Sequence, residues 1–129
     1  MNWFVDTKTE HAVTKAVVRG QLNANDYLEM RKHVRAQQIE QAGESVLLDL
    51  RQATLQFGTL DVFAIGLTHH EVFPRGTPYA ILMGPDTMNM VDARFLENLK
   101  FNRGSVAKVF TDEVAAEEWL LTDLEDPSS

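Results

Sequence analysis

The sequence predicts an α/β fold with a mostly parallel five-stranded sheet, an antiparallel edge strand and four helices. Short apolar runs alternate with amphipathic helical patterns along most of the chain, which is the element order of parallel α/β proteins. The runs at residues 45–50 and 79–84 are almost wholly apolar, as expected for strands covered on both faces. The chain has 129 residues, a length typical of one domain with a core of its own.

The first two strands are expected to form a hairpin. The run "HAVTKAVVRGQL" at residues 11–22 is rich in valine and leaves through a turn at Gly20, as a strand does. The preceding "NWFVD" at residues 2–6 is interpreted as a short edge strand. It would pair antiparallel with the second strand through the polar turn "TKTEH" at residues 7–11.

A first helix is predicted over residues 26–41. Asn23 or Asn25 can cap it, because an asparagine side-chain oxygen accepts a free backbone N–H at a helix start. Gly43 ends it. Helical spacing gives the expected inward face, which comprises Tyr27, Met30, Val34 and Gln38 or Ile39.

Three strands and three helices follow. After the strand at 45–50, a helix is predicted over residues 59–72 with an apolar stripe of Leu60, Phe63, Ala64 and Leu67. The strand at 79–84 precedes a third helix that starts at Asp86 and ends at Gly104, and its stripe is Met88, Val91, Phe95 and Leu99. The last strand is residues 106–110.

The final helix is expected to be capped by Thr111 or Asp112. Its expected inward residues are Val114, Ala115, Trp119 and Leu120. We therefore expect one domain over residues 1–124 and a flexible tail over 125–129.

The net charge of −7 is concentrated near one end of the chain. Seven of the 19 acidic residues lie between Asp112 and Asp126, where no basic residue occurs. The balance elsewhere disfavours nucleic acid as a partner, since phosphate backbones select basic patches. No apolar run approaches the ~20 residues that cross a bilayer, and the opening residues lack the pattern of a signal peptide. We expect a cytoplasmic protein with no transmembrane segment.

No catalytic, metal or cofactor site is expected. The chain has no cysteine, no glycine-rich phosphate loop and no serine in a nucleophile-elbow context. His69 and His70 are neighbours, so on a helix they point ~100° apart and do not converge on a metal; an exposed helix end is the simpler place for them. Asp49 and Arg51 share strand parity. An ion pair or a backbone hydrogen bond is a simpler role for Asp49 than catalysis.

The segment "VLLDLRQATLQFGTLDVF" at residues 46–63 carries apolar residues in an expected loop. Leu55 and Phe57 lie where solvent-facing residues are usual. They either fold inward as a lid over the sheet edge or present an apolar contact patch, which in general marks an interaction site. Met83, Met88 and Met90 cluster around the loop after the fourth strand, and methionine fills both cores and adaptable binding surfaces.

This segment resembles the strand–loop–helix of STAS domains, the fold of sulfate transporter and anti-sigma factor antagonist domains. The whole chain from residue 11 to 121 resembles the SpoIIAA-like branch, often labelled STAS/SEC14. The similar stretches are "VRGQL", "LLDLR", "YAILMG" and "VAKVFTDEVAAEEWLL". The resemblance implies a β/α superhelix. It also implies protein–protein regulation or apolar-ligand binding in place of catalysis.

The resemblance also assigns a position to the phosphorylated serine of anti-sigma factor antagonists. Aligning "LLDL" places Gly58 there, and Thr59 is the adjacent hydroxyl. Thr59 is interpreted either as a helix N-cap, which we expect, or as a phosphorylation site favoured by the helix dipole.

We therefore expect a non-enzymatic regulatory or protein-interaction module. Its partner is another protein or a second copy of the chain. The expected binding residues lie in the loops at the carboxyl ends of the strands, and they are Leu55, Phe57, Gly58, Thr59, Asp86, Met88 and Met90. The alternative is a small carrier of a lipid or other apolar ligand. It requires a cavity of ~300 Å³ or more, lined by Met83, Met88 and Phe57.

Overall fold

A computed structural model of the chain describes residues 2–74, 76–84 and 106–125, and it contains one five-stranded sheet. The strands lie in the order β1-β2-β3-β4-β5. Only the β1–β2 pair is antiparallel among them. The expected mixed sheet with an antiparallel edge strand is therefore confirmed. The strands are β1 (Trp3–Glu10), β2 (Val13–Asn23), β3 (Ser45–Gln56), β4 (Pro78–Leu82) and β5 (Val106–Phe110).

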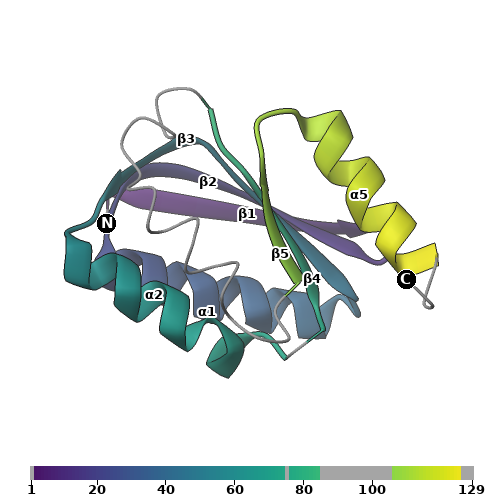
Figure 1. Cartoon of the computed structure of the whole chain (residues 1–129), viewed down its shortest axis with the longest axis horizontal. Helices are drawn as coiled ribbons and strands as arrows, with labels where there is room; N and C mark the ends of the chain where they lie inside the picture. The colour runs from purple at the N-terminus through teal and green to yellow at the C-terminus, as the bar shows by residue number, and fades with distance from the viewer. Residues whose placement is uncertain (1, 75, 85–105, 126–129) are drawn as a thin grey trace.

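Helices cover both faces of the sheet, as Figure 1 shows. On one face lie α1 (Ala24–Glu40) and α2 (Thr59–Val72), and on the other lies α5 (Glu113–Glu125). The bounds of α2 are those expected from the sequence. The remaining expected helix, from Asp86 to Gly104, lies outside the described residues. No helix in the described ranges combines the length and apolar character needed to cross a membrane.

The β1–β2 hairpin turns at His11 and Ala12, so the expected polar turn at residues 7–11 is wrong. Both turn residues have positive φ, 52° and 65°, as a two-residue type I′ turn requires. Thr7 and Thr9 are half-buried, while Lys8 and Glu10 are exposed. This alternation is that of a strand, and charged residues on its outer face are a common feature of edge strands.

A β-bulge in β3 reverses the alternation of its side chains. Val17 of β2 pairs with Asp49, but Arg19 pairs with Gln52, so β3 contains one extra residue. Leu48 and Leu50 lie in the larger core before the bulge, and Ala53 and Leu55 lie in it afterwards, so the inward parity changes from even to odd. The strand expected to end at residue 50 therefore continues to Gln56.

The larger core lies between the sheet and α1 with α2, and the smaller lies beneath α5. The N-cap of α1 is Asn23, whose side-chain oxygen accepts a hydrogen bond from the Asp26 N–H (2.9 Å). The expected inward residues of α1 are buried except Ile39, which is 62% exposed.

The start of α5 follows the expectation, and its inward face follows it in part. Asp112 accepts a hydrogen bond from the Ala115 N–H (3.2 Å), as a capping residue does. Ala116 and Leu120 are buried, while Val114 is 58% exposed. Leu120 and the partly buried Trp119 therefore face the core as expected, whereas Val114 does not, and Ala116 takes an inward place that was not expected.

Gly20 lies where the hairpin approaches its own backbone. Its φ is +102°, and a Cβ at this position would lie 2.1 Å from the Asn2 carbonyl oxygen. We expect Gly20→Ala to reduce the free energy of unfolding by about 2 kcal/mol or more, because strain and a backbone clash add. Denaturant unfolding measures the change.

Gly76→Ala is the matched control. Gly76 also has a positive φ, +89°, but an added Cβ meets nothing within 4 Å. Gly76→Ala should reduce the free energy of unfolding by about 1 kcal/mol, because only the penalty for a positive φ applies there. Equal losses in the two variants would contradict the proposed clash.

Candidate functional site

The candidate site lies at the carboxyl edge of β2 and β3. The strands end together, because Leu22 pairs with Leu55 and Asn23 pairs with Gln56. One helix follows each strand end, α1 at Ala24 and α2 at Thr59. The N-termini of both helices therefore open at the same edge of the sheet (Figure 1). In open parallel sheets this is where ligands and partners bind.

Leu55 and Phe57 both fold inward at this edge. Leu55 lies within β3 and is 3% exposed, so its expected place in a loop is wrong. The bulge explains this burial, since it returns odd-numbered residues to the core face. Phe57 is half-buried, and its ring meets that of Tyr27 edge to face at 5.5 Å between centroids.

Gly58, not Thr59, occupies the N-cap position of α2. Its backbone is extended, and its N–H donates a hydrogen bond to the Asp61 carboxylate at 2.8 Å. Thr59 is the first residue of the helix, so the expectation that it caps α2 is wrong. The carboxylate of Asp61 in the first turn also complements the helix dipole.

Leu60 is an exposed apolar residue at this edge. The prediction that it lies on the inward stripe of α2 is wrong. Leu60 is 83% exposed, and Ala64 is exposed as well. The buried stripe runs through Ile65, His69 and Phe73, which recur four residues apart. That spacing was a usable signal, but the histidine interrupts its apolar pattern.

We call the residues of this edge the carboxyl-edge surface. Its members are Asn23, Gln56, Phe57, Gly58 and Leu60. All are exposed except the half-buried Phe57.

Arg31 holds α2 against α1. The side chain is 4% exposed and donates hydrogen bonds to the Ile65 carbonyl (3.1 Å) and the Thr68 hydroxyl (2.8 Å). Burial raises the pKa of nearby Tyr27 to about 12 and that of Tyr79 well above its usual value. Both tyrosines therefore stay neutral in this cluster at physiological pH. The hydrogen bonds of Arg31 fix the position of α2 against α1.

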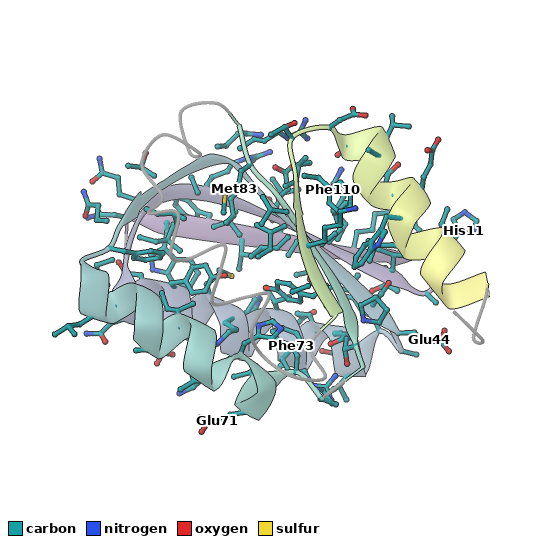
Figure 2. The ribbon with its side chains drawn as sticks, in the orientation of Figure 1. His11, Glu44, Glu71, Phe73, Met83 and Phe110 are labelled. Atoms are coloured by element: carbon teal, nitrogen blue, oxygen red, sulfur yellow. The ribbon has the colours of Figure 1, made fainter. Side chains whose placement is uncertain are left out.

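His69 belongs to the core, so its expected exposure at a helix end is wrong. It is 5% exposed and packs against the rings of Phe73 (5.3 Å) and Tyr79 (4.6 Å). Figure 2 shows Phe73 between the sheet and the helix layer. Within the described ranges, no cluster of three or more His, Cys, Asp or Glu residues could hold a metal ion.

Asp49 and Arg51 form the ion pair expected from their parity, on the α5 side of the sheet. Two guanidinium nitrogens of Arg51 donate to the carboxylate at 3.0 and 2.8 Å, and the Arg51 backbone N–H donates at 3.1 Å. Arg51 also contacts Glu113 of α5 at 3.2 Å, and Lys15 pairs with the same glutamate. The group therefore links β2, β3 and α5.

The pKa of Asp49 reflects a competition between burial and pairing. Burial raises the pKa, but the hydrogen bonds from Arg51 and the attraction of Arg51 and Lys15 together lower it below its usual value. Asp49 is therefore ionised at physiological pH, in a position that is 2% exposed. Asp49 thus has both the ion pair and the backbone hydrogen bond that were expected for it.

An open pocket of about 200 Å³ lies at the other end of the sheet, beside α5. Figure 2 shows His11 near the C-terminal end of that helix. None of its lining residues belongs to the carboxyl-edge surface. They are Lys8, Glu10, His11, Val13, Lys15, Leu47, Glu117 and Leu121.

Met83, expected to line a cavity in the carrier alternative, is fully buried in the larger core. Asp86, Met88 and Met90 lie outside the described residues.

Comparison with solved structures identifies the fold. An anti-sigma factor antagonist from Mycobacterium paratuberculosis superposes with a TM-score of 0.63 at 9% identity, over 92% of this chain and 94% of that one. A DUF3478-family protein from Shewanella loihica PV-4, described as having a SpoIIAA-like fold, gives a TM-score of 0.51 at 17% identity, over 92% and 93%. This chain has the SpoIIAA-like fold. The sequence matches no protein-family model and no curated protein.

The ion pair predicts an unusual pH dependence for Arg51→Met. In the wild type, the low pKa of Asp49 contributes stability above the unfolded-state pKa of about 4, which is lost as pH falls through the folded pKa. Without the guanidinium, burial dominates and raises the Asp49 pKa. We expect a loss of about 1–3 kcal/mol at pH 7 that shrinks as the pH falls toward 4, measured by urea unfolding.

Arg19→Met provides the control. Arg19 makes a long contact (3.9 Å) with Asp6, whose side chain is 79% exposed. Its loss should change stability by less than about 1 kcal/mol at either pH. A loss in Arg51→Met that stays constant with pH would exclude the proposed role of Asp49.

Proposed function

We propose that the chain is a non-enzymatic, STAS-type regulatory module of the SpoIIAA-like family that binds a protein partner through the carboxyl-edge surface. The likeness in fold to an anti-sigma factor antagonist supports the regulatory class. The observation that carries the proposal is Leu60, an apolar side chain that is 83% exposed at the first turn of α2. The proposed location is the cytoplasm.

The surface has the character of a protein-binding edge. Leu60 supplies an exposed apolar side chain, and it lies close in sequence to the exposed polar residue Gln56 and to Gly58, which has no side chain. Apolar residues surrounded by polar ones are typical of the centre and rim of an interface. The fixed position of α2 through Arg31 supports a preformed surface, which lowers the entropy lost on binding.

Four further residues extend the proposed surface, and Thr59 is the one that the structure describes. Thr59 begins the helix between Gly58 and Leu60, and phosphorylation there remains the alternative role for it. Asp61 already accepts the Gly58 N–H at this helix start, so a phosphate would meet a like charge nearby. Asp86, Met88 and Met90 stay predicted partner residues from the sequence alone.

The apolar-ligand carrier receives less support. Met83 packs inside the core, and Phe57 packs against it, so these two side chains fill space. The pocket beside α5 is smaller than the ~300 Å³ typical of ligand sites, and its lining includes five charged or titratable side chains, namely Lys8, Glu10, His11, Lys15 and Glu117.

Leu60→Asp tests the proposed surface. The tagged protein, expressed in its native host, is used to capture partners that quantitative mass spectrometry then identifies. We expect the wild-type partner to be lost from Leu60→Asp, because a carboxylate replaces the apolar contact. The free energy of unfolding should change by no more than about 0.5 kcal/mol, since the site is exposed.

The control is Val114→Asp, which places the same carboxylate on an exposed apolar position (58%) of α5, on the opposite face of the sheet. It should retain the partner. Retention by both variants, or loss from both, argues against the carboxyl-edge surface. Phosphate on Thr59 in protein purified from its own cells would instead support the phosphorylation alternative.

A further inference from the structure

The outer edge of β1 is long, regular and open. β1 pairs with β2 on one side, and in the described part of the chain no strand pairs with its other side. Its eight residues contain no proline, and its register with β2 is unbroken from Trp3–Gly20 to Glu10–Val13. Such an edge presents unpaired backbone groups and is a template for another strand.

The backbone groups that face outward can be assigned from the hairpin. A two-residue turn closes on a hydrogen-bonded pair, here Glu10 and Val13. At the far end, the Gln21 N–H donates to the Asn2 carbonyl at 2.9 Å. Hydrogen-bonded pairs alternate along an antiparallel ladder. The outward N–H and C=O groups therefore belong to the odd-numbered residues Trp3, Val5, Thr7 and Thr9.

We propose that two copies of the chain pair antiparallel through β1, with the two-fold axis at Thr7, to form one continuous ten-stranded sheet. Thr7 then exchanges both backbone hydrogen bonds with Thr7 of the second copy. Val5 does the same with Thr9 of that copy. These are groups that the hairpin leaves free, so the pairing breaks no existing bond.

Charge complementarity and the length of overlap together select this register. With the axis at Thr7, Asp6 of each copy lies opposite Lys8 of the other, which gives two cross-strand ion pairs. An axis at Asp6 or at Lys8 instead places two like charges directly opposite each other, which is unfavourable. An axis at Val5 sets Asp6 opposite Phe4 and forms no ion pair.

The length of overlap separates this register from one centred at Thr9. An axis at Thr9 would also form two ion pairs, Lys8 with Glu10, but it pairs only residues 8–10 of β1, whereas the axis at Thr7 pairs residues 4–10.

The same register covers an exposed aromatic residue. Phe4 is 70% exposed, and it lies on the α5 side of the sheet opposite Arg19. In the dimer it lies opposite Glu10 of the second copy and diagonal to Lys8, whose aliphatic stem can cover the ring. Within one chain Lys8 contacts Glu10 at 2.9 Å, but both side chains are exposed, so this pair is weak and can rearrange.

The β1 edge differs from the carboxyl-edge surface, so this inference goes beyond the proposed function. Leu60 lies on α2, whereas the dimer contacts lie on β1. Each of the two proposals can fail without the other.

Reciprocal charge reversal tests the register. The wild type should dimerise in sedimentation velocity across a dilution series. Asp6→Lys and Lys8→Asp should each weaken self-association by about tenfold or more, because each sets like charges opposite one another twice. An equimolar mixture of the two variants should form heterodimers, resolved by native mass spectrometry, because both cross-strand pairs are then attractive.

Controls separate this result from a loss of folding. Asp6 and Lys8 are 79% and 78% exposed, so thermal unfolding of the variants should stay near that of the wild type. Glu118→Lys, on an exposed position of α5, makes the same charge change as Asp6→Lys and should leave the dimer intact.

Three results would overturn the proposal. A wild type that stays monomeric at every concentration excludes a second copy as the occupant, even if an extended peptide binds β1. A dimer that neither variant weakens excludes the β1 edge. Weakening without recovery on mixing excludes the register centred at Thr7.

Discussion

The β-bulge of β3, with the ion pair beside it, determines where the other parts of the molecule lie. The extra residue leaves Arg51 and Gln52 together on the solvent side of the sheet. Arg51 then reaches back to Asp49, whose carboxylate would otherwise be buried without a counter-charge. Because Arg51 also contacts Glu113, the bulge ties the first turn of α5 to the middle of the sheet.

The bulge also positions the proposed interaction surface. It carries β3 on to Gln56, so that Leu55 packs in the core beside its partner Leu22. The strands β2 and β3 then end at the same point in the register, so α1 and α2 begin at the same edge of the sheet. With α2 held by Arg31 in the core, its first turn presents Leu60 to solvent. The exposed apolar residue is thus a consequence of strand register deeper in the sheet.

Sequence patterns predicted the five strands with an antiparallel edge strand, the bounds of α2, and Asn23 as one of two possible caps of α1, because each depends on local spacing or local hydrogen bonds. They missed what depends on pairing between distant segments. No glycine marks the bulge in β3, so nothing local signals that Leu55 turns inward. The polar residues of β1 look like a turn in the sequence, since one face of an edge strand needs no apolar pattern. Leu60 was misplaced because His69, a buried histidine, hides the true stripe of α2.

The two proposed surfaces are compatible with each other in one assembly. A two-fold axis perpendicular to the sheet reverses the strand direction between copies, so the carboxyl edges of the two sheets point in opposite directions. The carboxyl-edge surfaces then lie at opposite ends of the ten-stranded sheet. Each carboxyl-edge surface could bind its own partner without contact between the two partners. The proposed dimer would therefore be bivalent toward any assembly that displays two partner copies. Dimerisation would then increase avidity without altering the contacts that Leu60 makes.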